Sequence, residues 1–265
     1  MKLAIAGKGG VGKTFTSATL SRLLAREGYS VLAVDADPNF NLAYALGIDR
    51  EKADKIEPLT ENDELIKEKT GVSAEEAYSP VFNMTPTVND IVDRFGVDAP
   101  GGVKLLVMGT VRGGGTGCMC GANALLRVLI QHMLIQRGEI LVMDMVAGLE
   151  HLGRGTARRM DAMLVVVEPR MKSMDTIRRI LRLADEIEIK EIMAIGNKIS
   201  NKREEEFIRE HMKKFGIPIV AMIPYDEKVG EADMLGVPAI EHDSEAPAVR
   251  AVESLMYTLI ERFNP

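Results

Sequence analysis

Cysteine and tryptophan are the residue types that this sequence almost lacks, with two cysteines and no tryptophan among 265 residues. Small secreted domains held together by disulfides need many more cysteines, so the sequence is not of that class. No apolar run approaches the roughly 20 residues needed to cross a bilayer, and a strand-like segment stands where a signal peptide would be. We therefore expect a cytoplasmic protein with no membrane partner.

The sequence also lacks an excess of positive charge, because 33 Lys and Arg stand against 39 Asp and Glu, a formal net charge of −6. Nucleic acid is therefore not expected as a partner. Hydrophobic residues make up 46% of the chain, enough for a buried core, and the length fits one large α/β domain. We predict a single domain over residues 1–265, with a variable insertion around 48–102.

Short apolar segments alternate with segments of helical periodicity over most of the chain. The apolar segments predict strands at 3–6, 29–35, 103–108, 140–144, 162–167, 191–196 and 218–223. The periodic segments predict helices at 15–27, 122–136, 174–183, 202–215 and 246–262. This alternation predicts an α/β fold with a largely parallel central sheet flanked by helices, and the insertion could add an edge strand.

Residues 7–14, Gly-Lys-Gly-Gly-Val-Gly-Lys-Thr, form a glycine-rich loop between the first predicted strand and the first predicted helix. Gly, four residues, then Gly-Lys-Thr in this context is the pattern of a phosphate-binding loop. Glycines let backbone N–H groups point at phosphate oxygens, Lys13 supplies a positive charge, and the Thr14 hydroxyl is a ligand for Mg²⁺. The sequence predicts a P-loop that contacts a nucleotide through Gly9, Gly10, Val11, Gly12, Lys13, Thr14 and Phe15.

Aspartates at two predicted strand ends complete the expected nucleotide site. Ligands of open α/β sheets lie at the carboxyl ends of strands, where Asp35, Asp37 and Asp144 are placed by the sequence. Phosphoryl transfer needs a carboxylate near the metal and a group that orients water, which Asp144 and Asp37 can supply. The alternative is that each aspartate only caps the turn after its strand, and Asp35 could compete for either role.

Lys8 is a second lysine early in the loop. The run Lys-Gly-Gly-x-Gly-Lys-Thr resembles the deviant phosphate loop of the family that contains the nitrogenase iron protein, MinD and ParA. The resemblance implies a SIMIBI-type P-loop ATPase that works as a homodimer, in which Lys8 reaches the partner's nucleotide. It also implies that Asp37 positions the attacking water in switch I and that Asp144 reaches Mg²⁺ through water in switch II. The alternative for Lys8 is a solvated surface lysine.

Two further segments are expected near the nucleotide base. The same family recognises adenine with an asparagine that follows a buried strand, and this position resembles Asn197. Pro224 and Asp226 resemble its second base-contacting loop. No guanine motif follows Asn197, which favours ATP and ADP over GTP. A helix cap is the alternative for Asn197.

Cys118-Met119-Cys120 holds both cysteines of the chain in a glycine-rich loop. Inert buried thiols are expected within strands or helices, and a disulfide would close a very tight ring in a reducing compartment. Thiolates suit nickel, zinc or Cu(I). One chain supplies two ligands and a two-fold dimer supplies four, so we expect Ni²⁺ or Zn²⁺ between two chains, bound by Cys118 and Cys120.

The segments 117–124, Gly-Cys-Met-Cys-Gly-Ala-Asn-Ala, and 143–154, Met-Asp-Met-Val-Ala-Gly-Leu-Glu-His-Leu-Gly-Arg, resemble CooC-type maturation factors. The resemblance implies an ATP-hydrolysing nickel chaperone whose client is a nickel-containing carbon monoxide dehydrogenase.

Two other functions remain open from the sequence. An iron–sulfur reductase of the nitrogenase iron protein type also uses four thiolates across a dimer, but that family takes its second cysteine from near switch II. A MinD- or ParA-type positioning ATPase needs a basic amphipathic terminal helix or a basic DNA-binding patch. The predicted helix 246–262 has the apolar stripe of a core-packing helix and mixed charges instead.

Overall fold

The computed structural model describes residues 1–37, 39–71, 87–88, 90–109, 128, 139–145, 160–186, 189 and 191–265. The predicted metal ligands Cys118 and Cys120, nearly all of the predicted helix 122–136 and the segment 146–159 lie outside the described residues.

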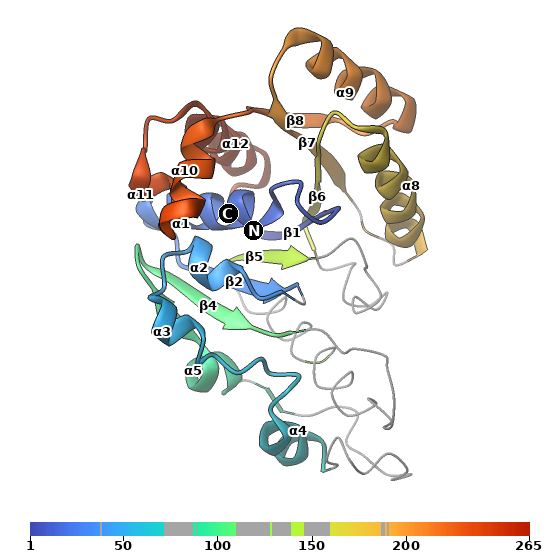
Figure 1. Cartoon of the computed structure of the whole chain (residues 1–265). Helices are drawn as coiled ribbons and strands as arrows, with labels where there is room; N and C mark the ends of the chain where they lie inside the picture. Colours follow the sequence, from blue (N-terminus) through green and yellow to red (C-terminus); the bar gives the residue numbers. More distant parts are fainter. Residues whose placement is uncertain are drawn as a thin grey trace.

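The described part of the chain is built on an eight-stranded sheet in the order β3-β4-β2-β5-β1-β6-β7-β8 (Figure 1). Neighbouring strands are parallel except for β3, which pairs antiparallel with β4 at one edge. The strands are β1 (Lys2–Gly7), β2 (Val31–Ala36), β3 (Val97–Ala99), β4 (Val103–Val107), β5 (Ile140–Met145), β6 (Ala162–Val167), β7 (Ile192–Ile199) and β8 (Ile219–Pro224). The predicted α/β fold with a largely parallel sheet is confirmed.

Helices cover both faces of the sheet, which is why its central strands are apolar throughout. Figure 1 shows α1 (Lys13–Arg26) and α12 (Pro247–Phe263) on one side, and α8 (Met171–Glu186) and α9 (Lys202–Phe215) on the other. Successive side chains of a strand point to opposite faces. In β6, Leu164 therefore packs into the core with α1 and α12, whereas Val165 packs into the core with α8 and α9.

Local sequence signals explain where the outer helices begin and end. Asn201 caps α9 by accepting a hydrogen bond from the N–H of Glu204, and Gly216 ends the helix with a φ of 70°. The predicted bounds of this helix and of strand β6 match the structure. Two short helices near the C-terminus, α10 (Glu227–Leu235) and α11 (Ala239–His242), were not predicted.

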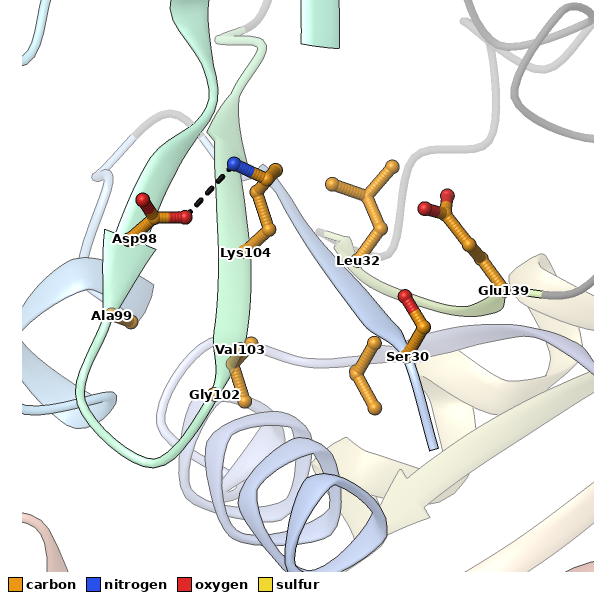
Figure 2. A pocket seen from close by; sticks show the side chains of 9 residues that line it. Ser30, Leu32, Asp98, Ala99, Gly102, Val103, Lys104 and Glu139 are labelled. Atoms are coloured by element: carbon orange, nitrogen blue, oxygen red, sulfur yellow. Dashed lines mark hydrogen bonds and ion pairs between the residues drawn. The ribbon is translucent and has the colours of Figure 1, made fainter. Parts of the chain in front are cut away.

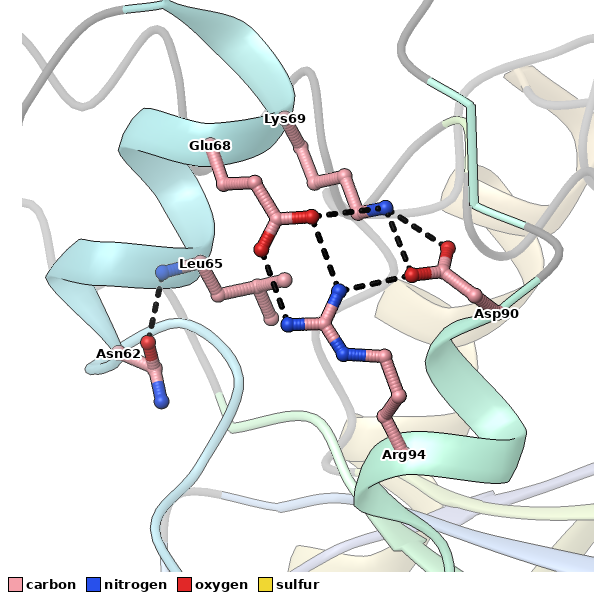
Figure 3. A network of polar contacts seen from close by, with 6 residues as sticks. All are labelled: Asn62, Leu65, Glu68, Lys69, Asp90 and Arg94. Atoms are coloured by element: carbon pink, nitrogen blue, oxygen red, sulfur yellow. Dashed lines mark hydrogen bonds and ion pairs between the residues drawn. The ribbon is translucent and has the colours of Figure 1, made fainter.

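The described part of residues 48–102 contains short helices and an edge strand, as expected, whereas the interpretation of this stretch as a variable insertion stays a prediction. Its helices are α3 (Arg50–Ala53), α4 (Asp63–Thr70) and α5 (Ile91–Phe95), and β3 is the edge strand; α2 (Leu42–Ala45) precedes it. Four charged residues join α4 to α5 (Figure 3). Arg94 donates to both oxygens of Glu68, and Lys69 donates to Asp90 over 2.7 Å. These cations lower the pKa of both carboxyls to about 2.

A cavity of about 230 Å³ lies near the amino ends of β2 and β4 (Figure 2). Lys104 on its wall donates to Asp98 over 2.8 Å. The P-loop follows the carboxyl end of β1, whereas this cavity lies at the amino ends of the strands, so the cavity is not part of the P-loop site. Among the described helices, none combines the length and apolarity needed to cross a bilayer.

Candidate nucleotide site

The P-loop leaves β1, a strand with neighbours on both sides, and enters α1 at Lys13. Its glycines are required by close contacts. A Cβ on Gly7 would lie 2.6 Å from the carbonyl oxygen of Val166. A Cβ on Gly12, whose φ is 98°, would lie 2.1 Å from the amide nitrogen of Asn197. Since the first turn of α1 contains no acidic residue, its free N–H groups present an uncompensated positive end to a phosphate.

Lys13 is the buried cation of this site, with 5% of its surface exposed. Its ammonium lies 3.5 Å from a carboxylate oxygen of Asp37, and the described residues give it no closer partner. The ammonium has three N–H donors. It can therefore bind a phosphate oxygen while remaining next to Asp37. The structure thus brings together two residues that the sequence placed 24 positions apart.

Thr14 and Asp144 form the second contact of the site. The Thr14 hydroxyl donates to one oxygen of Asp144 over 2.7 Å. The other oxygen, Oδ1, is buried and has no hydrogen-bond partner among the described residues. A buried, unpaired carboxylate oxygen costs stability unless a ligand satisfies it. Because Mg²⁺ prefers hydroxyl and carboxylate oxygens and retains water, this pair fits a magnesium site.

Asp35 and Asp144 are paired neighbours in the β2–β5 register, and both carboxyls are buried. Burial raises the pKa of Asp35 to about 7, and the nearby charge of Asp144 adds to this. Burial likewise raises the pKa of Asp144 to about 6, although the Thr14 hydrogen bond and the charge of Lys13 act against it. Ionising both groups without a bound cation therefore destabilises the folded chain.

We expect the free energy of unfolding of the nucleotide-free protein to fall as pH rises from about 4 to about 7. The folded pKa of Asp35 lies above its ordinary value of 3.8, so the folded state binds more protons in this window, and stability is lost as they leave. The loss should be of the order of a few kcal/mol. Urea denaturation at several pH values measures it.

Asp35→Asn should remove most of this pH dependence, because asparagine does not titrate. Asp175→Asn, at an exposed position of α8, is the control and should leave the dependence unchanged. An unchanged slope in Asp35→Asn would show that Asp35 is not the titrating group.

Asp35 also holds the segment that carries Asp37. One of its oxygens accepts the N–H of Asp37 over 3.0 Å, and the other accepts the N–H of Leu42 over 2.9 Å. With both oxygens engaged by backbone, Asp35 supports Asp37 and does not compete with it. The second of these contacts lies seven residues along the chain and has no sequence signal.

Asn197 and Lys198 lie in the last part of β7, which extends to Ile199 and not only to the predicted end at residue 196, and both contact the P-loop. The Asn197 amide donates to the carbonyl oxygen of Val11 over 2.7 Å, and its own oxygen accepts the N–H of Lys198. Lys198 has a φ of 57° and its ammonium donates to the carbonyl oxygen of Gly10 over 2.7 Å. The predicted adenine contact of Asn197 stays a prediction. The Lys198 contact is a part of the site that sequence reasoning missed.

The remaining predicted contacts lie around this centre. Gly9 and Gly10 are exposed, Phe15 packs partly against the core, and the half-exposed Lys8 side chain makes no hydrogen bond or ion pair with described residues. Pro224 ends β8. Both carboxylate oxygens of Asp226 accept backbone N–H groups, from Lys228 at the start of α10 and from Ala248. Its predicted contact with the base stays a prediction.

A glycine loop that exposes N–H groups beside a buried lysine, at the carboxyl edge of a parallel sheet, defines the class of P-loop nucleotide-binding proteins. Comparison with known proteins narrows the class. Residues 2–239 match the CobQ/CobB/MinD/ParA nucleotide binding domain. The chain belongs to this family, and the prediction of a P-loop ATPase of the MinD/ParA superfamily is confirmed.

Two relatives align over essentially the whole chain. An uncharacterised ATP-binding protein of Methanocaldococcus jannaschii is 41% identical, with 100% of this chain and 99% of the relative covered. The carbon monoxide dehydrogenase accessory protein CooC of Rhodospirillum rubrum is 40% identical, with 100% and 98% covered. Among solved structures, a chain of the MinC:MinD cell division protein complex of Aquifex aeolicus has a TM-score of 0.69 at 20% identity, with 98% of this chain and 96% of that chain covered. This last likeness concerns the fold alone.

Proposed function

We propose that this ATPase is a nickel chaperone that hydrolyses ATP and matures a nickel-containing carbon monoxide dehydrogenase. The observation that carries the proposal is the 40% identity to CooC over both whole chains, in a sequence that also contains Cys118-Met119-Cys120. Metal capture needs the thiolates, and ATP hydrolysis at the nucleotide site supplies the energy that drives release of the metal ion.

The chain's own groups account for ATP hydrolysis. Backbone N–H groups of residues 9–14 and the ammonium of Lys13 bind the phosphates. Asp37, held 3.5 Å from that ammonium, orients a water toward the γ-phosphorus. The water oxygen bonds to phosphorus as the bond to the bridging oxygen breaks, and a proton of the water passes to a phosphate oxygen or to solvent, which gives ADP and phosphate. Thr14 and Asp144 would hold Mg²⁺, which supplies positive charge to the phosphate oxygens when bound.

Lys8 explains why hydrolysis would require a dimer. Its side chain has no partner among the described residues, and it belongs to a loop whose neighbouring glycines are exposed. In a homodimer that closes face to face, each Lys8 would reach the nucleotide of the other chain. A cation supplied in this way can raise kcat by roughly 10³–10⁵.

Nickel is the cargo of the proposed cycle. Each chain of the dimer contributes Cys118 and Cys120, and the resulting four soft thiolates suit Ni²⁺ or Zn²⁺. Loss of the γ-phosphate removes the group next to Lys13 and Asp37, so the hold of the nucleotide on the Asp37 segment and on Asp144 weakens. The dimer then opens, and the thiolates separate from the metal.

The decisive experiment measures metal stoichiometry together with oligomeric state. Metal-free protein would be titrated with Ni²⁺ and separately with Zn²⁺, with ADP, with a slowly hydrolysed ATP analogue and without nucleotide. We expect one ion per dimer, more tightly held in one nucleotide state. Cys118→Ser/Cys120→Ser should lose the ion, whereas Met119→Leu, which changes the same loop but retains both thiols, should keep it.

Two outcomes would point elsewhere. Absence of cysteine-dependent metal binding in every nucleotide state would reduce the chain to an ATPase with another client. A brown protein with sulfur-to-iron charge-transfer absorption would favour an iron–sulfur reductase.

A further inference from the structure

The last turn of α10 and the second residue after it expose three apolar side chains. Met234 is 82% exposed, Leu235 66% and Val237 39%. Gly236 between them has a φ of 67° and turns the chain away from the helix. We call Met234, Leu235 and Val237 the α10 tip. Single exposed apolar residues are common, whereas contiguous exposed apolar surface marks interaction sites, and these three side chains stand within four residues of one another.

The helix that carries the tip is firmly attached to the rest of the fold (Figure 1). Asp226 caps its first turn and also binds the N–H of Ala248 at the start of α12. Ala232 is buried, and Val229 packs against the core. The tip is therefore the outer end of an anchored helix, and folding alone gives no reason for its apolar character.

The segment that carries the tip is acidic in sequence, although Glu241 pairs with Arg22 and Glu245 lies 3.9 Å from Arg250. Residues 226–245 contain seven acidic residues and one lysine, a formal charge of −6 with His242 neutral. The whole chain also has a formal charge of −6, so the other 245 residues are neutral in sum. Asp233, next to the tip, is exposed and forms no ion pair with described residues. The acidic residues are Asp226, Glu227, Glu231, Asp233, Glu241, Asp243 and Glu245.

The sign of this charge decides what can cover the tip. A second copy of the chain that presented the same acidic segment would bring like charge against it. An anionic lipid surface or a nucleic acid would be repelled for the same reason. A protein surface with an apolar pocket ringed by Lys and Arg would gain both from burial of the tip and from opposite charges around it.

We propose that the α10 tip docks the client protein through such a basic-rimmed apolar pocket. This inference rests on the proposed function, because it takes the nickel-free carbon monoxide dehydrogenase as the client. The tip is the far end of α10, the first helix after β8 ends at Pro224.

The test measures binding of the nickel-free dehydrogenase to the whole protein, and its activation by nickel and ATP. Met234→Ser/Leu235→Ser should weaken binding about tenfold or more. ATP hydrolysis and nickel stoichiometry should not change, which also shows that the variant is folded. Met171→Ser is the matched control, since this methionine is 55% exposed at the start of α8 and lies outside the acidic segment. Asp233→Asn should slow association and weaken its dependence on salt.

The outcomes separate the two proposals. If the wild-type protein binds and activates the dehydrogenase and the double variant does so equally well, the docking site is wrong and the function stands. If the wild-type protein neither binds nor activates the dehydrogenase, the proposed function fails and the docking site fails with it.

Discussion

Replacing Lys13 by alanine should reduce ATP hydrolysis by at least about 10²–10³-fold and abolish dimerisation driven by ATP. Lys13 is buried, and its ammonium is the cation that lies nearest to Asp37, at 3.5 Å. Alanine removes the charge that neutralises the phosphates and leaves the Asp37 carboxylate facing them. Phosphate release assays and light scattering with a slowly hydrolysed ATP analogue measure the two effects.

Lys8→Ala is the matched comparison, because it removes the same charge from the same loop. Lys8 is partly exposed and has no partner among described residues, whereas Lys13 is enclosed. We therefore expect Lys8→Ala to retain nucleotide binding by the single chain and to lose hydrolysis. ATP-driven dimers of normal stability from Lys13→Ala would contradict the role of Lys13. Equal loss of single-chain nucleotide binding in both variants would contradict the role of Lys8 in the partner's site.

The centre of this site could be predicted because its groups are local in sequence. Gly12, Lys13 and Thr14 act from consecutive positions, and the helix that begins at Lys13 is predicted by the periodic spacing of its own apolar residues. Asp144 could be placed because an apolar strand that ends in aspartate leads to the carboxyl edge of the sheet. Because each is a short apolar run, the parallel strands of the sheet were predicted to within three residues at either end.

The parts that could not be predicted depend on contacts between distant segments. The contact of Lys198 with Gly10 spans 188 positions. Helix α10 has Gly230 at its centre and several charges, and it lacks a clear apolar stripe. It forms because Asp226 and Gly236 cap it and because α11 and the core support it. The metal-binding role of Cys118 and Cys120 stays a prediction, since both lie outside the described residues.

Arg22 shows most clearly how much a sequence can conceal. It lies on α1 and is only 4% exposed. An arginine in an amphipathic helix is normally expected on the side that faces solvent. Its guanidinium donates to the carbonyl oxygen of Leu46 over 2.8 Å and forms an ion pair with Glu241 of α11. Gly47 and Gly101 lie against it, and a Cβ on either would approach its side chain to 3.1 or 3.2 Å.

Glu241→Ala should lower the free energy of unfolding by about 3 kcal/mol, because it leaves a buried guanidinium charge without its carboxylate. Arg22→Met should cost less, about 1–3 kcal/mol, since the remaining Glu241 side chain is 43% exposed and only the Leu46 carbonyl loses its partner. Urea denaturation of both variants measures these values. Arg178→Met, which breaks an exposed ion pair on α8, should change stability by less than about 0.5 kcal/mol.

The double variant Arg22→Met/Glu241→Ala tests the cause. If Glu241→Ala loses stability because the buried Arg22 charge is left unpaired, removing Arg22 as well should recover stability. The free energy of unfolding of the double variant should then lie within about 0.5 kcal/mol of that of Arg22→Met. Additive losses would show that Arg22 and Glu241 stabilise the fold separately, through packing. Because Arg22 joins α1 of the P-loop to the end of α2 and to α11, recovery of stability with reduced kcat would also show that this ion pair positions the segment carrying Asp37.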